Sequence, residues 1–373
     1  MMSTNNNFIP LMVKNFQAIF IVCISAESIA EPAPWEVSGN VVITHQTASE
    51  SYILNEAAGS ADLVVQRQYG SGNWLAHVEA SSTPRSNGVS AILPEANADV
   101  GSALDEDNAG RIQLSELYYS YFFGDDKALS VGLLDVSGFF EQSRIASDET
   151  TQFLGAFFTG NPTIEFPDYA LGIVHEAGLS QDVVLRAALV SSDGLADNPE
   201  RSYSQLLSVD DGEGVFAISS ASWEARSWLF RAGAWLHTTG HQTLDMKSND
   251  QNNYGAYMLA GYTRDRHSTN IRFGVANPEV SQAVSFTSVA YLYEYGPYTA
   301  GAGIGRAFIS SQEPSTELDD TVQYEFFLRY TLHQNLFFTG DVQRISSSNY
   351  GALPENRNQN THVYGVRLTW LYD

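Results

Sequence analysis

The chain ends in residues 361–373, which read T-H-V-Y-G-V-R-L-T-W-L-Y-D. Successive side chains of an extended strand point to opposite faces. One face of this strand, from residue 364 onward, therefore carries large apolar or aromatic residues, namely Tyr364, Val366, Leu368, Trp370 and Tyr372. In a closed sheet the last strand must pair with the first, so no edge is left unpaired. We therefore predict that this terminal strand closes a transmembrane β-barrel.

The same period-two alternation runs through the chain from Glu31 onward, in segments of about ten residues, and helical spacing is nearly absent. The fold class is thus all-β, an antiparallel transmembrane β-barrel of sixteen strands. An even number is expected of a bacterial barrel whose two ends lie in the periplasm. The predicted strands are 34–46, 60–69, 73–81, 111–123, 127–135, 170–179, 182–190, 214–222, 226–238, 253–263, 268–276, 283–295, 298–308, 321–332, 335–344 and 361–372.

The connections between these strands alternate in length. Tight turns such as Gly296-Pro297 and His333-Gln334 follow the even-numbered strands, with slightly longer ones near 223–225 and 264–267. The odd-numbered strands are mostly followed by long polar segments: 82–110, 136–169, 191–213, 239–252, 309–320 and 345–360. This alternation predicts short periplasmic turns and long extracellular loops. A soluble sandwich or a β-helix has no reason to sort its loops in this way.

The first thirty residues are typical of a secretory signal peptide. Lys14 precedes an apolar run at 16–24, and the small residues Ser28 and Ala30 suit cleavage before Glu31. We therefore predict a signal peptide at 1–30 and a single outer-membrane barrel domain at 31–373. Beyond the signal, no apolar run approaches the roughly 20 residues that a membrane helix needs.

Length, charge and cysteine content narrow the function classes. The 373 residues suffice for two soluble domains or one large barrel. A formal net charge of −24 argues against nucleic acid as a partner. The single cysteine, Cys23, lies inside the predicted signal, so the mature chain has no disulfide and no cysteine-ligated metal site.

Several predicted strands separate an apolar face from a face that carries charge. A Lys or Arg facing lipid near mid-membrane costs about 2–4 kcal/mol, so the charged face must point into the barrel. Sixteen strands leave room for an aqueous channel. An alternative is that these charges only pair across the interior and stiffen the wall. The residues predicted to line the pore are Glu79, Glu116, Arg186, Arg231, Arg272, Glu325, Arg329, Asp341 and Arg367.

The long segment 136–169 is too apolar to lie in water. It contains four phenylalanines in two pairs, Phe139-Phe140 and Phe157-Phe158, together with Phe153 and Leu154. We expect it to fold into the barrel and narrow the lumen. We also expect a short helix in its middle, with Asp148 and Glu149 near the start of a turn.

Residues 132–168 contain the motif G-x-x-D-V-S-G-F-F-E-Q-S-R-I-A-S-D-E-T-T-Q-F-L and then N-P-T-I-x-F-P-D. This motif resembles the carbohydrate-selective porins of the OprB type. Further similarity comes from S-E-L-Y-Y at 115–119, F-T-G-D-V-Q at 338–343 and G-V-R-L at 365–368. The resemblance runs through most of the mature chain, and clearly matching motifs cover about a quarter of it.

The resemblance implies a sixteen-stranded outer-membrane pore for passive diffusion of mono- or oligosaccharides, selected by polar lumen residues. It adds Asp135 and Gln343 to the pore-lining set, and it places Asp148, Glu149 and Gln152 in a constriction loop. The other positions that match family motifs are Glu116, Glu325, Asp341 and Arg367.

Other functions are less favoured. A general or anion-preferring porin remains an alternative, because the arginines favour anions and the overall acidity does not. A barrel enzyme would need a nucleophile and a base in contact, yet the chain has no G-x-S-x-G or H-E-x-x-H motif and its eight histidines are scattered. We therefore expect no catalytic residue, no cofactor and no metal. The expected partners are small saccharides and outer-membrane lipids, and either a monomer or a trimer is compatible with the sequence.

Overall fold

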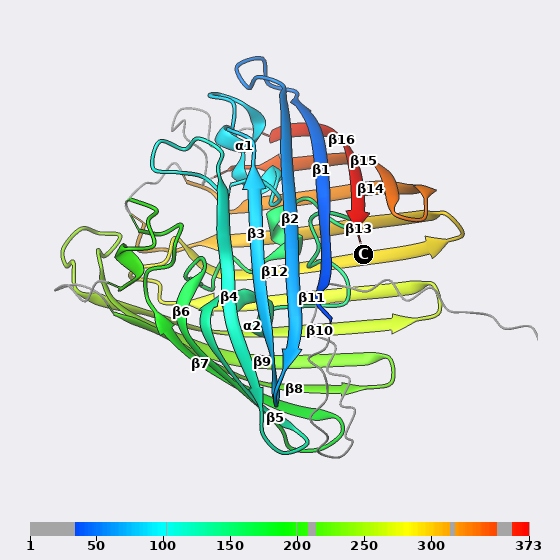
Figure 1. Cartoon of the computed structure of the whole chain (residues 1–373). Helices are drawn as coiled ribbons and strands as arrows, with labels where there is room; N and C mark the ends of the chain where they lie inside the picture. Colours follow the sequence, from blue (N-terminus) through cyan, green and yellow to red (C-terminus); the bar gives the residue numbers. More distant parts are fainter. Residues whose placement is uncertain are drawn as a thin grey trace, which may run out of the picture.

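The computed structural model describes residues 34–101, 103–198, 200–207, 214–313, 318–348 and 360–372. The predicted signal peptide and its cleavage site lie outside these residues. The described chain forms a closed antiparallel barrel in which each strand pairs with its sequence neighbours and β16 pairs with β1. Figure 1 shows this single wall, with the first strand (blue) beside the last (red).

The sixteen predicted strands are confirmed, and most bounds agree within about two residues. They are β1 (Glu36–Ala48), β2 (Glu56–Tyr69), β3 (Gly72–Ser81), β4 (Ile112–Phe122), β5 (Lys127–Leu134), β6 (Ala170–Gly178), β7 (Val183–Ser191), β8 (Val215–Ala225), β9 (Trp228–His241), β10 (Gln251–Arg264), β11 (His267–Ala276), β12 (Ala283–Tyr295), β13 (Tyr298–Ile309), β14 (Thr321–His333), β15 (Leu336–Ser346) and β16 (Asn360–Tyr372).

Barrel closure uses the terminal stretch as expected. β16 runs antiparallel to β1, with Gly39 opposite Tyr372, Thr44 opposite Arg367 and Ala48 opposite Val363. The same strand pairs with β15 on its other side. The last strand therefore has no free edge, which removes the exposed backbone groups that an open sheet would present.

The turns at one end of the barrel are tighter than the sequence indicated. Only residues 226–227 separate β8 from β9, and only 265–266 separate β10 from β11. Arg226 and Asp265 have positive φ angles of 55° and 56°. Two-residue hairpin turns require such left-handed residues, a role usually filled by Gly or Asn. The absence of those residue types explains why longer turns were expected here.

The wall is apolar outside and polar inside. In β16 and β14 exposed and buried residues alternate strictly over most of the strand. Outward-facing residues include Tyr324, Phe326, Leu328 and Trp370, each between 41% and 54% exposed. No helix among the described residues is long and apolar enough to cross a membrane.

The helices are short and lie on the connections. They are α1 (Val89–Ile92), α2 (Val136–Phe140) and α3 (Ala156–Thr159), with 3-10 turns η1 (Pro94–Ala96) and η2 (Gln205–Leu207). Phe157 of α3 clusters with Phe286 and Ala307 of the wall. The segment after β5 therefore folds into the barrel, as expected, and Figure 1 shows α2 inside the wall.

A second connection also packs against the interior, which the sequence analysis did not predict. Val89, Ile92, Leu93 and Ala96 are buried in one cluster with Ile345 and Val363 of β15 and β16. The segment 82–110 was expected to be a polar extracellular loop. Instead, its apolar residues recur at the three- and four-residue spacing of a helix face, and that face covers the wall.

An arginine on the outer face should test the orientation of the wall. Phe326→Arg, in the middle of β14, should destabilise the barrel by about 2–4 kcal/mol, because it places a cation in hydrocarbon. Leu332→Arg lies on the same face near the end of the strand, where the cost falls to about 0–1 kcal/mol. Urea unfolding in lipid vesicles measures both variants. Equal losses would contradict the assigned depth and orientation.

Candidate functional site

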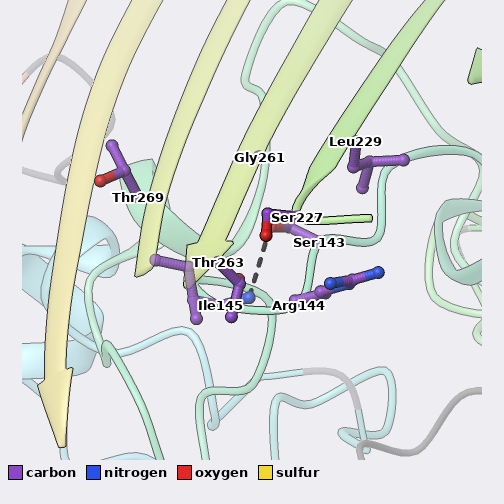
Figure 2. A pocket seen from close by; sticks show the side chains of 8 residues that line it. All are labelled: Ser143, Arg144, Ile145, Ser227, Leu229, Gly261, Thr263 and Thr269. Atoms are coloured by element: carbon purple, nitrogen blue, oxygen red, sulfur yellow. Dashed lines mark hydrogen bonds between the residues drawn. The ribbon is translucent and has the colours of Figure 1, made fainter. Parts of the chain in front are cut away.

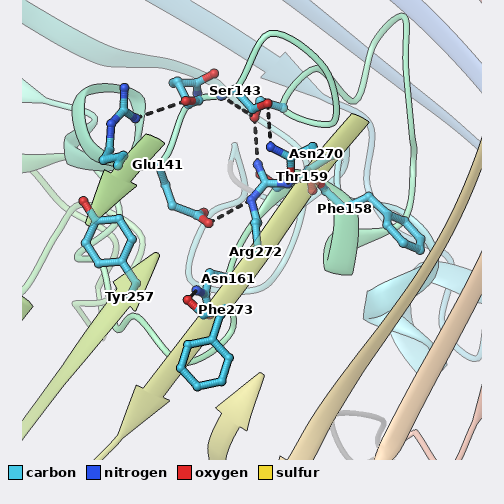
Figure 3. Close-up of polar contacts among 12 residues, drawn as sticks. Glu141, Ser143, Phe158, Thr159, Asn161, Tyr257, Asn270, Arg272 and Phe273 are labelled. Atoms are coloured by element: carbon cyan, nitrogen blue, oxygen red, sulfur yellow. Dashed lines mark hydrogen bonds and ion pairs between the residues drawn. The ribbon is translucent and has the colours of Figure 1, made fainter. Parts of the chain in front are cut away.

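The interior is organised around residues 135–169, called the inserted loop below, which connect β5 to β6. Arg272 of β11 has no exposed surface and contacts this loop at several points. Its guanidinium donates to Glu141 at 2.9 Å and to the Ser147 hydroxyl at 2.8 Å, and also to the carbonyl of Phe158. Figure 3 shows these groups converging on one side chain. One buried arginine thus joins both halves of the inserted loop to the wall.

Three other predicted arginines bind the loop in the same way. Arg231 donates to two carbonyl oxygens, those of Phe140 and Gln142, both at 3.0 Å. Arg329 donates to the Thr151 carbonyl at 2.7 Å. Arg367 donates to the Gln152 carbonyl at 2.6 Å and to that of Glu149. The wall therefore supplies cationic donors for loop carbonyls that have no strand to pair with.

Wall acceptors satisfy the loop's amide groups. The Glu325 carboxylate accepts from the backbone N–H groups of Leu154 and Gly155, at 2.8 and 2.7 Å. The Gln323 side chain accepts from the N–H of Phe157 at 3.1 Å. A Cβ atom at Gly155 would lie 2.5 Å from Gln323 and 2.6 Å from Glu325, so only glycine permits this approach.

Glycines of β13 make room for α3. A Cβ at Gly303 would lie 2.5 Å from the Phe158 ring, and one at Gly305 would lie 2.9 Å from Phe157. Both positions face inward, because alternate residues of a strand share a face. On the other side of α3, Asn161 donates to the Phe273 carbonyl at 3.3 Å (Figure 3). The inserted loop is therefore fitted to the β11–β13 wall by shape as well as by hydrogen bonds.

Wall side chains near those that hold the inserted loop also form hydrogen bonds with the segment 82–111. Gln323 donates to the carbonyl of Glu95 at 2.7 Å, and Gln343 donates to that of Ala96 at 2.9 Å. The N–H of Ala98 also donates to the carbonyl of Leu154 in the inserted loop, at 2.9 Å. Both segments therefore share one set of anchors, and Gln323 is an anchor that sequence reasoning missed.

A different environment lies along β2–β4. The inward-facing side chains of Asp62, His77, Glu79 and Glu116 are only half-buried, in contrast to the arginines beneath the inserted loop. His77 lies between two carboxylates, 3.1 Å from Asp62 and 3.3 Å from Glu116. This wall is therefore acidic where it is not covered.

Carboxyl groups of the two folded-in segments are also close to these wall acids. Burial raises the pKa of Glu149 to about 8, and the charges of Asp148, Asp99 and Asp62 raise it too. Burial likewise raises the pKa of Asp99 to about 6. We call Asp62, Glu79, Glu116, Asp99, Asp135, Asp148 and Glu149 the acidic cluster. It brings together seven carboxyl groups from three strands and two connections.

The inserted loop leaves little space against β9–β11. Figure 2 shows a pocket where Ser143, Arg144 and Ile145 of the loop face the wall residues Ser227, Leu229, Gly261, Thr263 and Thr269. Its volume is about 10 Å³, enough for about one water molecule. A sugar does not fit into this pocket.

The remaining predicted site residues have other partners. Arg186 pairs with Glu176 at 2.5 Å and donates to the Ser222 hydroxyl at 3.4 Å, both of them groups of the wall. Asp341 accepts from Gln343 at 3.0 Å. Asp135 caps α2 by accepting from the N–H groups of Ser137 and Gly138, at 2.9 and 3.2 Å. Whether these side chains touch a solute stays a prediction.

The helix expected in the middle of the inserted loop is not there. Its helices lie near the ends, at 136–140 and 156–159. Asp148 instead stabilises a single turn. Its side chain accepts hydrogen bonds from the backbone N–H groups of Thr150 and Thr151, at 3.0 and 3.1 Å. Aspartate side chains compete with helix hydrogen bonds in this way. The turn points the carbonyls of Glu149, Thr151 and Gln152 at the wall arginines.

Two groups of side chains have the composition of a metal site. They are Asp62 with His77 and Glu79, and Glu165 with His237 and His241. Within each group the potential ligand atoms lie within 4.8 Å of one another. The first belongs to the acidic cluster, while the second lies outside it.

Comparison with known proteins gives the family. The family model described as carbohydrate-selective porin, OprB family, matches residues 53–372 of this chain. The chain belongs to this family. Its sequence is 24% identical over 321 residues to an uncharacterised protein of Aquifex aeolicus (strain VF5), covering 86% of each chain.

Solved structures support the fold. A high-pH structure of Pseudomonas putida OprB matches with a TM-score of 0.71 and 11% identity, covering 91% of this chain and 94% of that one. A mutant of the Rh. blastica porin matches with a TM-score of 0.56 and 14% identity, covering 91% of this chain and all of that one. Both likenesses are those of a porin barrel, and a porin is a channel of the outer membrane rather than an enzyme.

Removing the guanidinium group of Arg272 should show whether this side chain anchors the inserted loop. Arg272→Ala leaves Glu141 buried without its cation and should destabilise the barrel by about 3–5 kcal/mol. Because the inserted loop also loses its anchor, single-channel current should become larger or noisier. Arg186→Ala is the matched control, since it removes an arginine that pairs with Glu176 and Ser222 of the wall. Identical currents in both variants would show that Arg272 does not hold the loop.

Proposed function

We propose that the protein is an outer-membrane porin through which mono- or oligosaccharides diffuse passively along β2–β4, past the acidic cluster. The observation that carries this proposal is the unequal cover of the inner wall. Arg231, Arg272, Arg329 and Arg367 are between 0% and 7% exposed beneath the folded-in segments, whereas Asp62, His77 and Glu116 keep side-chain exposures of 16–21%. The arginines then hold the loop, and the acids meet the solute.

The side chains along this route suit a sugar. Carboxylates accept hydrogen bonds from hydroxyl groups and so replace part of the solute's hydration. Beside Glu116, the rings of Tyr118 and Phe139 meet edge to face with centroids 6.0 Å apart. Phe139 and Leu75 are only partly buried there. Apolar side chains next to carboxylates offer contacts to both the C–H and the O–H groups of a saccharide, without closing around it.

The same cluster bears on the alternative of an anion-preferring pore. Carboxylates facing the route attract cations and repel anions. The guanidinium groups that favoured anions donate to backbone carbonyls behind the inserted loop. We therefore favour cations over anions among charged solutes, and neutral sugars over both.

The remaining parts of the proposal concern export and assembly. The signal peptide at 1–30 directs the chain to the periplasm, and the apolar outer face then contacts outer-membrane lipids. N-terminal sequencing of the mature protein checks cleavage before Glu31. Chemical cross-linking in mild detergent distinguishes a monomer from a trimer.

Sugar block of single-channel current tests the substrate class. In planar bilayers, a saccharide that occupies the route should lower the conductance, and Glu116→Gln should weaken this block by about tenfold, the value of one charge-assisted hydrogen bond. Glu50→Gln, on the outer connection between β1 and β2, is the control. If none of a panel of mono- and oligosaccharides lowers the current, the sugar assignment fails although the pore remains.

The raised pKa values predict pH-dependent ion selectivity. Asp99, with a pKa of about 6, and Glu149, with a pKa of about 8, are neutral in acid and become negative as the pH rises. Cation preference, measured as reversal potential in a KCl gradient, should therefore increase between pH 5 and 9. Glu149→Gln should remove the upper part of this increase. A reversal potential that is constant over this range would place both carboxyls away from the route.

A further inference from the structure

Glu165, His237 and His241 bring two imidazoles and one carboxylate together outside the acidic cluster. The histidines lie four residues apart on β9, on either side of an irregularity in its pairing with β10. Glu165 comes from the inserted loop, 76 residues before His241. The potential ligand atoms of the three side chains lie within 4.8 Å of one another.

Backbone carbonyls fix the orientation of both rings. The Nε2 atom of His237 lies 3.1 Å from the Ser192 carbonyl oxygen, and the Nδ1 atom of His241 lies 3.2 Å from that of Gln251. A carbonyl only accepts, so each of these ring nitrogens must donate its N–H. Metal-binding histidines almost always donate their other ring N–H in this way, which fixes the tautomer and frees one nitrogen for the metal.

The free nitrogen of His237 has no partner. This side chain is only 5% exposed, and its Nδ1 atom is buried without a hydrogen bond. A buried polar atom that lacks a partner costs free energy, and a bound cation would remove this cost. The nitrogen belongs to a ring whose centroid is 5.0 Å from that of His241.

The other two side chains already have the required geometry. The Nε2 atom of His241 lies 2.9 Å from one carboxylate oxygen of Glu165, and the other oxygen accepts from Asn253 at 2.6 Å. Ligand atoms bound at 2.0–2.1 Å in a tetrahedral zinc site lie about 3.3 Å apart. The ligand atom of His237 lies within 4.8 Å of these two, so His237 has to approach them to complete a set of three.

We propose that His237, His241 and Glu165 bind a divalent transition-metal ion of the Zn²⁺ type. Two imidazoles and a carboxylate suit zinc, whereas magnesium and calcium favour all-oxygen ligands. The ion replaces the proton shared by His241 and Glu165, and that proton passes to water. Because Glu165 is exposed, a water molecule completes the fourth position.

The bound ion has a structural consequence for the inserted loop. Among its other wall contacts, arginines of β9, β11, β14 and β16 hold residues 140–159, and Asn161 donates to the Phe273 carbonyl of β11. Glu165 lies beyond them, five residues before β6 begins. A metal bridge to β9 therefore fastens the returning end of the loop.

Isothermal titration of the full-length folded barrel with ZnCl₂ tests the site. We expect one equivalent to bind to the wild type. His237→Asn with His241→Asn should weaken this binding by more than about 100-fold, since the loss of an outer partner alone costs 10–100-fold. Co²⁺ provides a second probe, because its visible absorption distinguishes a four-coordinate nitrogen–oxygen site from the six-coordinate hydrated ion.

His77→Gln is the matched control, because it removes a histidine from the other metal-like group and should leave zinc binding at β9 unchanged. Heat-modifiable migration in gels confirms that each variant is a folded barrel. If the double variant misfolds, Glu165→Gln tests the same zinc site, because it removes the exposed carboxylate ligand. The proposal is overturned if the wild type binds no zinc, or if zinc and cobalt bind folded variants as they bind the wild type.

Discussion

The interior depends on one constraint: the outer face of the wall must be apolar, so every charge on the strands has to be satisfied inside. The arginines meet this constraint by donating to backbone carbonyls of the inserted loop rather than mainly to wall carboxylates. Arg231 and Arg367 each bind two loop carbonyls. The loop needs these donors because it has too little regular structure to satisfy its own backbone. The wall arginines and the loop carbonyls therefore depend on each other for their hydrogen-bond partners.

This mutual requirement divides the interior into two sides. Where the folded-in segments cover the wall, shape and hydrogen bonds agree closely, as at Gly155 and Gly303. Along β2–β4 the wall is less covered, and the side chains there are carboxylates and a histidine. In the proposed function, selectivity depends on these few groups, and the remaining charges maintain the architecture.

The sequence predicts the wall well because alternation and hairpin length are local properties. Two-residue turns at Arg226 and Asp265 were placed less well, since neither residue type is typical of a left-handed turn. Lumen-facing charges could be located by the cost of exposing them to lipid. Their partners could not, because Arg272 and the Phe158 carbonyl are 114 residues apart and no local pattern joins them.

Two features were visible in the sequence but were not used. The spacing of Val89, Ile92, Leu93 and Ala96 marks an apolar helix face inside a connection that was judged polar by its composition. His237 and His241 lie only four residues apart, although the histidines were judged scattered. The middle of the inserted loop was misjudged because Asp148 favours its own turn over a helix.

The placement of the anchors also determines the order of assembly. Arg367 is 218 residues from the Glu149 carbonyl it binds, and Gln343 is 247 residues from that of Ala96. Contacts this distant in sequence form late and slow the folding of a chain. Neither segment has all of its anchors until β15 and β16 are in place. The narrowing of the interior is therefore completed only when the last strands have joined the barrel.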